Sequence, residues 1–247
     1  MKKIIVVLVV IVLLFSTDCA KEENKTSVYS AASLTEVLDE YNNLIDKKMN
    51  LNFDSSTRLR IQIENGAEPD IYLSANQKNI DILKEKNLVK ESKEILKNRM
   101  VIITPKDSKV KSPLDLTKNI KLVIAEEEVP CGRYALEVLD NYNSKYGKDY
   151  SGKVLNNVVS RELNVKLVVS KITMGEADAG IVYITDINQN NKEKINIIEI
   201  GQDFNINASY WICRINDNNE SKEFYKNFLE DDNMKNIFEK YGFRVIY

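Results

Sequence analysis

Hydrophobic and polar residues follow two rhythms along the chain, and together these rhythms predict alternating strands and helices. Continuous apolar runs such as 100–104 and 122–125 are typical of strands buried on both faces. Elsewhere, apolar residues recur three and four positions apart, as at Leu34, Val37 and Leu38, which is the spacing of one helix face. Because the two patterns alternate throughout, the sequence predicts an α/β fold with mostly parallel sheets.

The same pattern gives approximate bounds for each element. Expected strands share apolar or alternating character and cover 28–29, 49–53, 71–74, 100–105, 122–125, 158–160, 179–183, 195–200 and 208–215. Expected helices share the longer spacing and cover 33–45, 56–65, 77–86, 133–142, 162–174 and 220–241, the last in two pieces. The polar stretch 146–152 is expected to be a loop.

The stretch 29–36 predicts a strand end, a tight turn and a helix start. Ser33 is a typical N-cap residue, and Glu36 three positions later completes the pattern of a capping box. Backbone N–H groups at a helix start, together with a hydroxyl, form a ready site for an anion. An ordinary cap on an ordinary turn is the simpler interpretation of this stretch taken alone.

The N-terminal residues are typical of a targeting segment. Lys2 and Lys3 precede an apolar run, 4–15, that is too short to cross a bilayer comfortably. Small residues and then Cys19 resemble a bacterial lipoprotein signal, in which the cysteine is lipidated and becomes the mature N-terminus. Asp18 departs from the small residue usual before that cysteine, and an uncleaved anchor is the alternative.

We therefore expect a signal peptide at 1–18 and a polar tether at 19–26. The expected location is extracytoplasmic, with the protein anchored to the cell membrane by a lipid on Cys19.

Composition narrows the classes of function. The chain has 247 residues and a net charge of −2, so its charge gives no reason to expect a nucleic-acid partner. The absence of histidine removes His-based triads and His-ligated metal sites. Cys131 and Cys213 lie far apart without Cys-x-x-Cys spacing, so isolated thiols are expected, although a single bridge is possible in an exported protein.

Several stretches, in one order along the chain, resemble the molybdate-binding proteins of bacterial ABC importers, within the periplasmic-binding-protein superfamily. The matching stretches span most of 27–243 and are 31–35 (Ala-Ala-Ser-Leu-Thr), 53–56, 62–71, 74–78, 129–135, 175–183 (ending Gly-Ile-Val-Tyr) and 241–243. The resemblance implies two doubly wound α/β domains joined by two crossing strands, the type II arrangement, with the ligand in the cleft between them. The implied domains are 27–104 with 212–247, and 105–211.

The resemblance also implies five oxyanion-binding residues, namely Ser33, Ser56, Cys131, Val165 and Tyr183. The family usually has alanine at the position of Cys131, and that position and Val165 are implied to act through backbone N–H groups. All five can donate hydrogen bonds and none carries a fixed charge. Such a site suits an oxyanion without a proton, namely molybdate, tungstate or sulfate, better than phosphate.

The implied function is that of an extracytoplasmic substrate-binding protein that delivers molybdate or tungstate to an ABC permease. No enzymatic activity, no cofactor, no nucleic acid and no metal other than the metal-centred ligand are expected, and a monomer is expected. Alternatives are a binding protein for sulfate or another tetrahedral oxyanion, or an exported hydrolase, for which no Gly-x-Ser-x-Gly motif is present. A transcription-regulator sensor is disfavoured by the signal segment.

The sequence departs from the family pattern at Thr57-Arg58, at 126–128 and at 161–163. These departures leave open the roles of Arg58 and of Glu126, Glu127 and Glu128. The preference between molybdate and tungstate and the identity of the permease also stay open.

Overall fold

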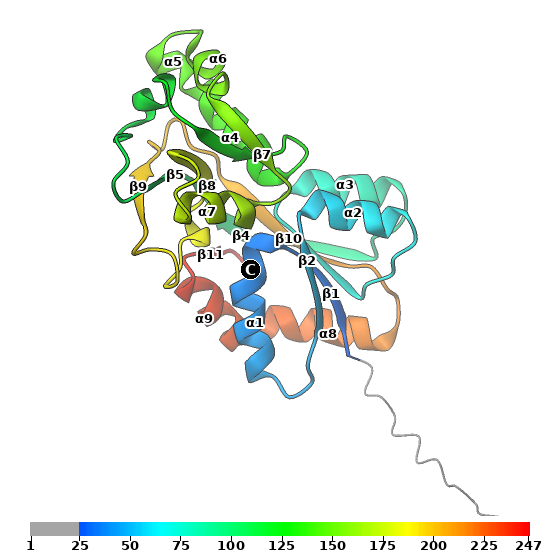
Figure 1. Ribbon diagram of the computed structural model, residues 1–247. Coiled ribbons are helices and arrows are strands. Elements are labelled where there is room, and N and C mark those ends of the chain that lie inside the picture. Colours follow the sequence, from blue (N-terminus) through cyan, green and yellow to red (C-terminus); the bar gives the residue numbers. More distant parts are fainter. Residues whose placement is uncertain (1–24) are drawn as a thin grey trace, which may run out of the picture.

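The computed structural model describes residues 25–247, which form two lobes, each built around one β-sheet (Figure 1). The expected signal peptide 1–18, the lipidation site Cys19 and most of the tether 19–26 lie outside the described residues. Strands and helices alternate along the described part, so the predicted α/β class is confirmed. No helix within 25–247 is long and apolar enough to cross a membrane.

The first lobe holds a sheet of six strands. Their order across the sheet is β11 (Arg244–Val245), β4 (Glu91–Asn98), β10 (Ala208–Arg214), β3 (Ile71–Ser74), β1 (Ser27–Ala31) and β2 (Asn50–Asp54). The helices of this lobe are α1 (Thr35–Leu44), α2 (Ser56–Glu64), α3 (Gln77–Glu85), α8 (Asn219–Glu230) and α9 (Asp232–Lys240). The separation of α8 from α9 confirms the prediction that the last helical stretch is in two pieces.

The second lobe holds a sheet of five strands. Their order is β7 (Val158–Glu162), β6 (Leu122–Ala125), β8 (Ala179–Tyr183), β5 (Met100–Pro105) and β9 (Ile195–Glu199). The helices of this lobe are α4 (Pro130–Asn141), α5 (Asn143–Tyr146), α6 (Tyr150–Leu155) and α7 (Val165–Thr173).

Both sheets are mixed rather than mostly parallel. In the first sheet β1 runs parallel to β2 and β3, and in the second β6 runs parallel to β7 and β8, as the strand–helix alternation predicts. Other strands pair in the antiparallel direction. β10 is antiparallel to β3 and β4, and β5 is antiparallel to β8 and β9. The chain enters β5 and β10 from the other lobe and not through a helical crossover within the same sheet, so the rule for parallel pairing does not govern these two strands.

The chain crosses between the lobes twice. It leaves the first sheet at Asn98, the end of β4, and enters the second at Met100, with only Arg99 between. It returns between Glu199, the end of β9, and Ala208, the start of β10. The expected boundaries at 104/105 and 211/212 therefore fall inside β5 and β10, and we propose instead that the two domains meet at these crossings.

Some segments differ from the sequence-based expectation. The helix expected at 162–174 begins only at Val165, because Glu162 pairs with Ala125 as the end of β7. β4 was not expected because its first half is charged, yet Ile95 and Leu96 are buried and hold it in the sheet. The expected loop 146–152 contains the end of α5 and the start of α6. There Tyr146 stacks on the ring of Tyr142 at 5.5 Å and lies 5.1 Å from that of Tyr150, an aromatic contact that sequence spacing did not reveal.

A close helix–strand contact brings the start of α4 onto the end of β6. A Cβ atom at Gly132 would lie 2.0 Å from the carbonyl oxygen of Glu126 and 2.5 Å from that of Ala125. Only glycine therefore permits α4 to begin this close to the sheet. The start of α4 faces the first lobe across the candidate site, which lies between the lobes.

Candidate functional site

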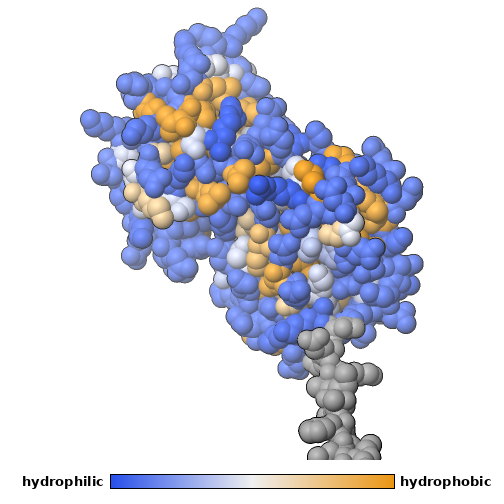
Figure 2. Space-filling view, turned by 45° about the vertical axis from the view of Figure 1, so that its right-hand side comes forward, coloured by the Kyte–Doolittle hydropathy of each residue, from blue (hydrophilic) through white to orange (hydrophobic). Residues whose placement is uncertain are grey.

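A small cavity lies where helix starts from the two lobes meet. Its walls are made by twelve residues, namely Ala31, Ala32, Ser33, Ser55, Ser56, Ala75, Val129, Pro130, Cys131, Asn164, Val165 and Tyr183. The structure thus brings together all five residues that the resemblance implied. No lining residue has a carboxylate or a basic side chain, whereas the face of the molecule shown in Figure 2 is mostly hydrophilic.

The cavity is the size of one small anion. It leaves about 20 Å³ for the centre of a water-sized sphere. A sphere of that volume, widened by a water radius of about 1.4 Å, corresponds to an occupant with a radius of about 3 Å. A single tetrahedral oxyanion has this size, whereas a sugar or a peptide does not.

Four helical segments begin at the cavity. The 3₁₀ turn η1 (Ala32–Leu34) and helix α2 come from the first lobe, and α4 and α7 come from the second. The first N–H groups of a helix have no partner within the helix, and each N-terminus carries about half a positive charge. Because Pro130 has no N–H, Cys131 supplies the first backbone donor of α4. The convergence therefore favours an anion without any charged side chain.

Ser56 is not the N-cap of α2, although a serine at the start of a helix is most simply interpreted as one. Ser55 takes that role, since its Oγ accepts the N–H of Arg58 at 3.3 Å. The Oγ of Ser56 instead accepts the backbone N–H of Ala75, at the end of β3, at 2.9 Å. The neighbouring Tyr72 hydroxyl donates to the Ser56 carbonyl at 2.7 Å, which fixes the start of α2.

Ser33 is likewise not a helix cap. It lies within η1, and neither η1 nor α1 has a side-chain cap hydrogen bond. Its Oγ lies 2.8 Å from the hydroxyl oxygen of Tyr210, on β10. The predicted capping box of Ser33 and Glu36 is wrong, and the serine hydroxyl is left for the cavity.

Tyr183 presents an unpartnered phenol. Its side chain is 1% exposed, and its hydroxyl oxygen has no hydrogen-bond partner among the described residues. Burial raises the pKa of this hydroxyl well above its usual range, so the group stays protonated and can donate. A buried polar group without a partner costs free energy, which is the usual mark of a group kept for a ligand.

Cys131 and Val165 face the cavity from the second lobe. The thiol of Cys131 donates to the carbonyl oxygen of Ile181 at 3.6 Å, and burial raises its pKa, so it is a neutral group engaged with the sheet. Val165 begins α7, whose cap is Asn164, with its Oδ1 accepting the N–H of Leu167 at 3.2 Å. Both side chains are apolar or engaged elsewhere, which leaves their backbone N–H groups as donors.

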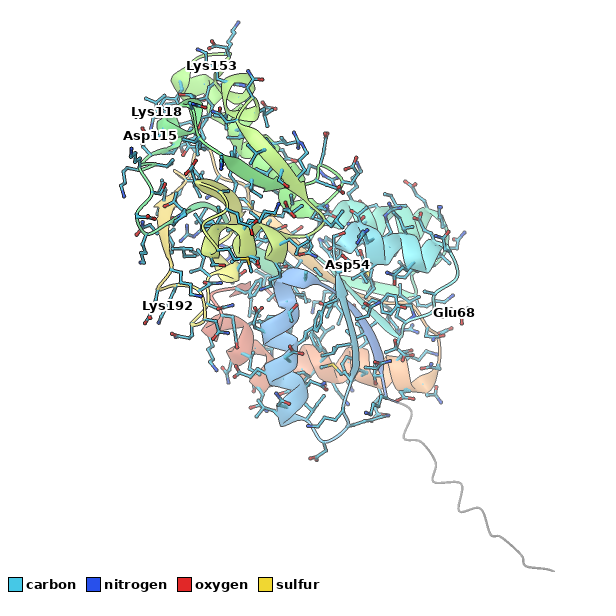
Figure 3. All side chains as sticks on the ribbon, in the orientation of Figure 1. Asp54, Glu68, Asp115, Lys118, Lys153 and Lys192 are labelled. Atoms are coloured by element: carbon cyan, nitrogen blue, oxygen red, sulfur yellow. The ribbon has the colours of Figure 1, made fainter. Side chains whose placement is uncertain are left out.

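The residues whose roles the sequence left open lie beside the cavity rather than in its wall. Arg58 is 3.4 Å from Asp54, which Figure 3 labels at the end of β2, and its side chain is half exposed. Glu127 and Glu128 are exposed. The carbonyl oxygen of Glu128 accepts the hydroxyl of Thr57, a contact between the two lobes.

A buried ionic cluster lies near the cavity and was missed by sequence reasoning. Asp186, in the 3₁₀ turn η3 (Ile184–Asp186), is fully buried, and burial raises the pKa of its carboxyl from 3.8 to about 6. The Lys166 ammonium lies 3.4 Å from Asp186 Oδ1 and 2.6 Å from Glu36 Oε2. Tyr210 was missed as well, because nothing in the sequence near Ser33 points to a partner 177 positions away.

The described residues contain no group of three or more His, Cys, Asp or Glu side chains that could hold a metal ion. The cavity wall instead offers the side chains of Ser33, Ser56 and Tyr183 and the starts of four helical segments.

Comparisons with known proteins agree with this geometry. The sequence pattern of the family described as bacterial extracellular solute-binding protein matches residues 26–244. The chain is 32% identical to a Bacillus subtilis protein provisionally named as an ABC transporter substrate-binding lipoprotein, YvgL, over 92% of this chain and 89% of that protein. It is 31% identical to the Haemophilus influenzae molybdate-binding protein ModA, over 89% of each chain.

Among solved structures, the chain resembles the substrate-binding domain of a provisionally named molybdenum ABC transporter from Clostridium difficile. The TM-score is 0.64 and the sequence identity 32%, over 90% of this chain and 99% of that one.

Proposed function

This chain belongs to the bacterial extracellular solute-binding proteins, a family of binding proteins that serve ABC transporters, and on that premise we propose that it captures molybdate or tungstate. The bound oxyanion would be delivered to a permease in the membrane. The relatives named above support this choice of ligand, as does the cavity described here.

The observation that carries the proposal is the unpartnered hydroxyl of Tyr183, a residue of a cavity wall to which two serines and several helix starts also belong. Hydrogen bonds between neutral donors and an ionised acceptor are roughly twice as strong as neutral ones. An oxyanion with two charges would satisfy Tyr183 and draw on Ser33, Ser56 and the helix N-termini at once.

The absence of an ionised carboxylate from the cavity wall selects against a ligand that carries a proton. Phosphate near neutral pH keeps one proton, which requires an acceptor. Molybdate, tungstate and sulfate have none. We propose that the site therefore discriminates against phosphate, because phosphate carries a proton that finds no acceptor there.

Thermal unfolding of the purified protein with each oxyanion tests the proposal. Molybdate and tungstate should raise the melting temperature in a concentration-dependent way, because only the folded state binds them. Phosphate should leave it unchanged. A shift with sulfate or phosphate, and none with molybdate or tungstate, would contradict the assignment.

We also propose that the protein is a monomer held at the outer face of the cell membrane by a lipid on Cys19. The basic start, the apolar run and the following cysteine support this, as does the name of the Bacillus subtilis relative. Cys19→Ser should release the protein from the membrane fraction. Mass spectrometry that finds Cys19 unmodified in the membrane-bound protein would rule the anchor out.

A further inference from the structure

A chain of buried hydrogen bonds runs from the crossing strand β4 to the cavity. The side-chain amide of Asn98, at the end of β4, lies 3.4 Å from the hydroxyl of Tyr210 on β10. The Tyr210 hydroxyl lies 2.8 Å from Ser33 Oγ, which lines the cavity. All three side chains are at most 6% exposed, so bulk water does not supply alternative partners.

The direction of this chain is set at its far end. The backbone N–H of Arg99 donates to Asn98 Oδ1 at 2.9 Å. A backbone N–H can only donate, so the amide oxygen of Asn98 must face Arg99 and its NH₂ group must face the other way. That NH₂ group donates to the Thr185 hydroxyl oxygen at 2.7 Å and to Tyr210.

Tyr210 must therefore donate to Ser33. Among the described residues, its hydroxyl contacts only the NH₂ group of Asn98, which has no lone pair to offer, and Ser33 Oγ. A buried phenol that leaves its proton unused costs free energy. The Tyr210 hydroxyl consequently donates its hydrogen bond to Ser33 Oγ. The proton of Ser33 itself has no acceptor among the described residues. It is left to point into the cavity.

Ser56 is arranged in the same way by a shorter route. The backbone N–H of Ala75 donates to Ser56 Oγ at 2.9 Å, and the Ser56 proton has no acceptor among the described residues. Each serine oxygen thus accepts a hydrogen bond from the surrounding protein, and each serine proton can be donated to a ligand in the cavity. A ligand proton aimed at either hydroxyl would meet another proton.

We propose that Tyr210, oriented by Asn98, is a positioning residue that holds the Ser33 hydroxyl as a donor, so that the site selects oxyanions without a proton. This rests on the proposed function, because it concerns how the same cavity recognises its ligand. Neither residue lines the cavity, and the Tyr210 hydroxyl acts on it through its hydrogen bond to Ser33.

Sulfate and phosphate provide a clean comparison at mildly alkaline pH. Both are then tetrahedral dianions of similar size, and only phosphate has a proton. Their inhibition constants are measured by displacement of molybdate from the wild-type protein and from Tyr210→Phe. The substitution removes only the hydroxyl and keeps the ring, which packs on Tyr183 and Phe243.

Tyr210→Phe should weaken molybdate binding about three- to tenfold, the size of one neutral hydrogen bond. It should also reduce the preference for sulfate over phosphate by a similar factor, because Ser33 can then turn and accept. In a Ser33→Ala background the same substitution should change neither quantity. Thr185→Val is the matched control, since it removes the other partner of the Asn98 amide and should leave the preference unchanged.

Asn98→Asp provides a second variant should Tyr210→Phe fold poorly. A carboxylate at this position accepts a hydrogen bond from the Tyr210 hydroxyl, which then accepts one from Ser33, so the direction of the hydrogen bonds is reversed. The added negative charge affects the binding of the two dianions equally. The preference for sulfate should fall again. An unchanged preference in both variants, or an equal effect with and without the Ser33 hydroxyl, overturns this inference alone. A wild-type protein that binds no molybdate or tungstate overturns the proposed function and this inference with it.

Discussion

The Lys166 ammonium on α7 lies 2.6 Å from Glu36 Oε2 on α1, so an ion pair joins the two lobes beside the cavity. Asn188 adds a second contact to the same carboxylate, with its Nδ2 donating to Glu36 Oε1 at 3.1 Å. With the hydrogen bond from Thr57 to the Glu128 carbonyl, the lobes are held on two sides of the site. These contacts are available only when the lobes lie together, so they favour the closed arrangement.

Glu36→Gln should favour an open arrangement and weaken molybdate binding about two- to fivefold, as expected for a partly exposed ion pair. Titration calorimetry measures the affinity. X-ray scattering of the wild-type protein should show a more compact particle with molybdate than without, because closing the cleft brings the lobes together.

Asp149→Asn serves as the control for Glu36→Gln. It breaks the exposed pair with Lys153, which Figure 3 labels at the far end of the second lobe and which is local to α6. It should change neither affinity nor scattering. Identical scattering with and without saturating ligand would count against lobe closure.

Ser33→Ala, Ser56→Ala and Tyr183→Phe should weaken molybdate binding most. Each removes one hydrogen bond to a charged ligand, worth about 1.5–3 kcal/mol, or roughly ten- to hundredfold in affinity. Cys131→Ala should be far milder, because its thiol bonds to the Ile181 carbonyl and only its N–H is expected to reach the ligand.

Ser30→Ala is the matched control for this ranking. Ser30 is fully buried close to Ser33 in sequence, but it does not line the cavity. If its loss, or that of the Cys131 thiol, weakens binding as much as Ser33→Ala does, then the anion lies elsewhere.

Asp186→Asn should stabilise the protein at neutral pH. Burial raises the pKa of this carboxyl from 3.8 to about 6, so the folded state binds more protons than the unfolded state between those values. The free energy of unfolding therefore falls as pH rises through that window, by up to about 3 kcal/mol. The variant should gain most above pH 6 and nothing below pH 4, as measured by urea unfolding across this range.

Asp115→Asn should show the opposite pH dependence of stability to Asp186→Asn. Hydrogen bonds from Lys118, the Lys111 backbone and Ser112 lower the pKa of the Asp115 carboxyl, so this group stabilises the fold above its ordinary pKa (Figure 3). Its loss should destabilise the protein at neutral pH and matter least in acid. Equal pH profiles for the two variants would refute the assignment of Asp186 as a strained buried acid.

Gly132→Ala should strongly destabilise the protein, because the new Cβ would overlap the backbone oxygens of Glu126 and Ala125. Gly152→Ala, within α6, meets nothing within 4 Å and should be neutral or stabilise the helix by about 0.5–1 kcal/mol. Thermal unfolding measures both. A tolerated Gly132→Ala would mean that α4 can move away from β6 without loss.

The sequence by itself determined the α/β class, most of the helices and strands and, through the resemblance, five of the twelve residues that line the cavity. It could do so because apolar spacing records which face of each element is buried, and because the family-like stretches fall at helix starts and strand ends. It misjudged β4, which is held by pairing with β10 and β11 far along the chain, and α5 and α6, where the rings of Tyr142, Tyr146 and Tyr150 pack together.

Only the tertiary structure decided what the site serines do. Local pattern made Ser33 a helix cap, whereas its hydroxyl pairs with Tyr210, 177 positions away. Ser56 is similarly engaged by Ala75, on another strand, and the Tyr183 phenol is left without a partner. A hydroxyl has one proton and two lone pairs, so its direction depends on every neighbour that folding brings to it. Sequence can place such a group at a site, but the groups packed behind it determine whether it gives or receives a hydrogen bond.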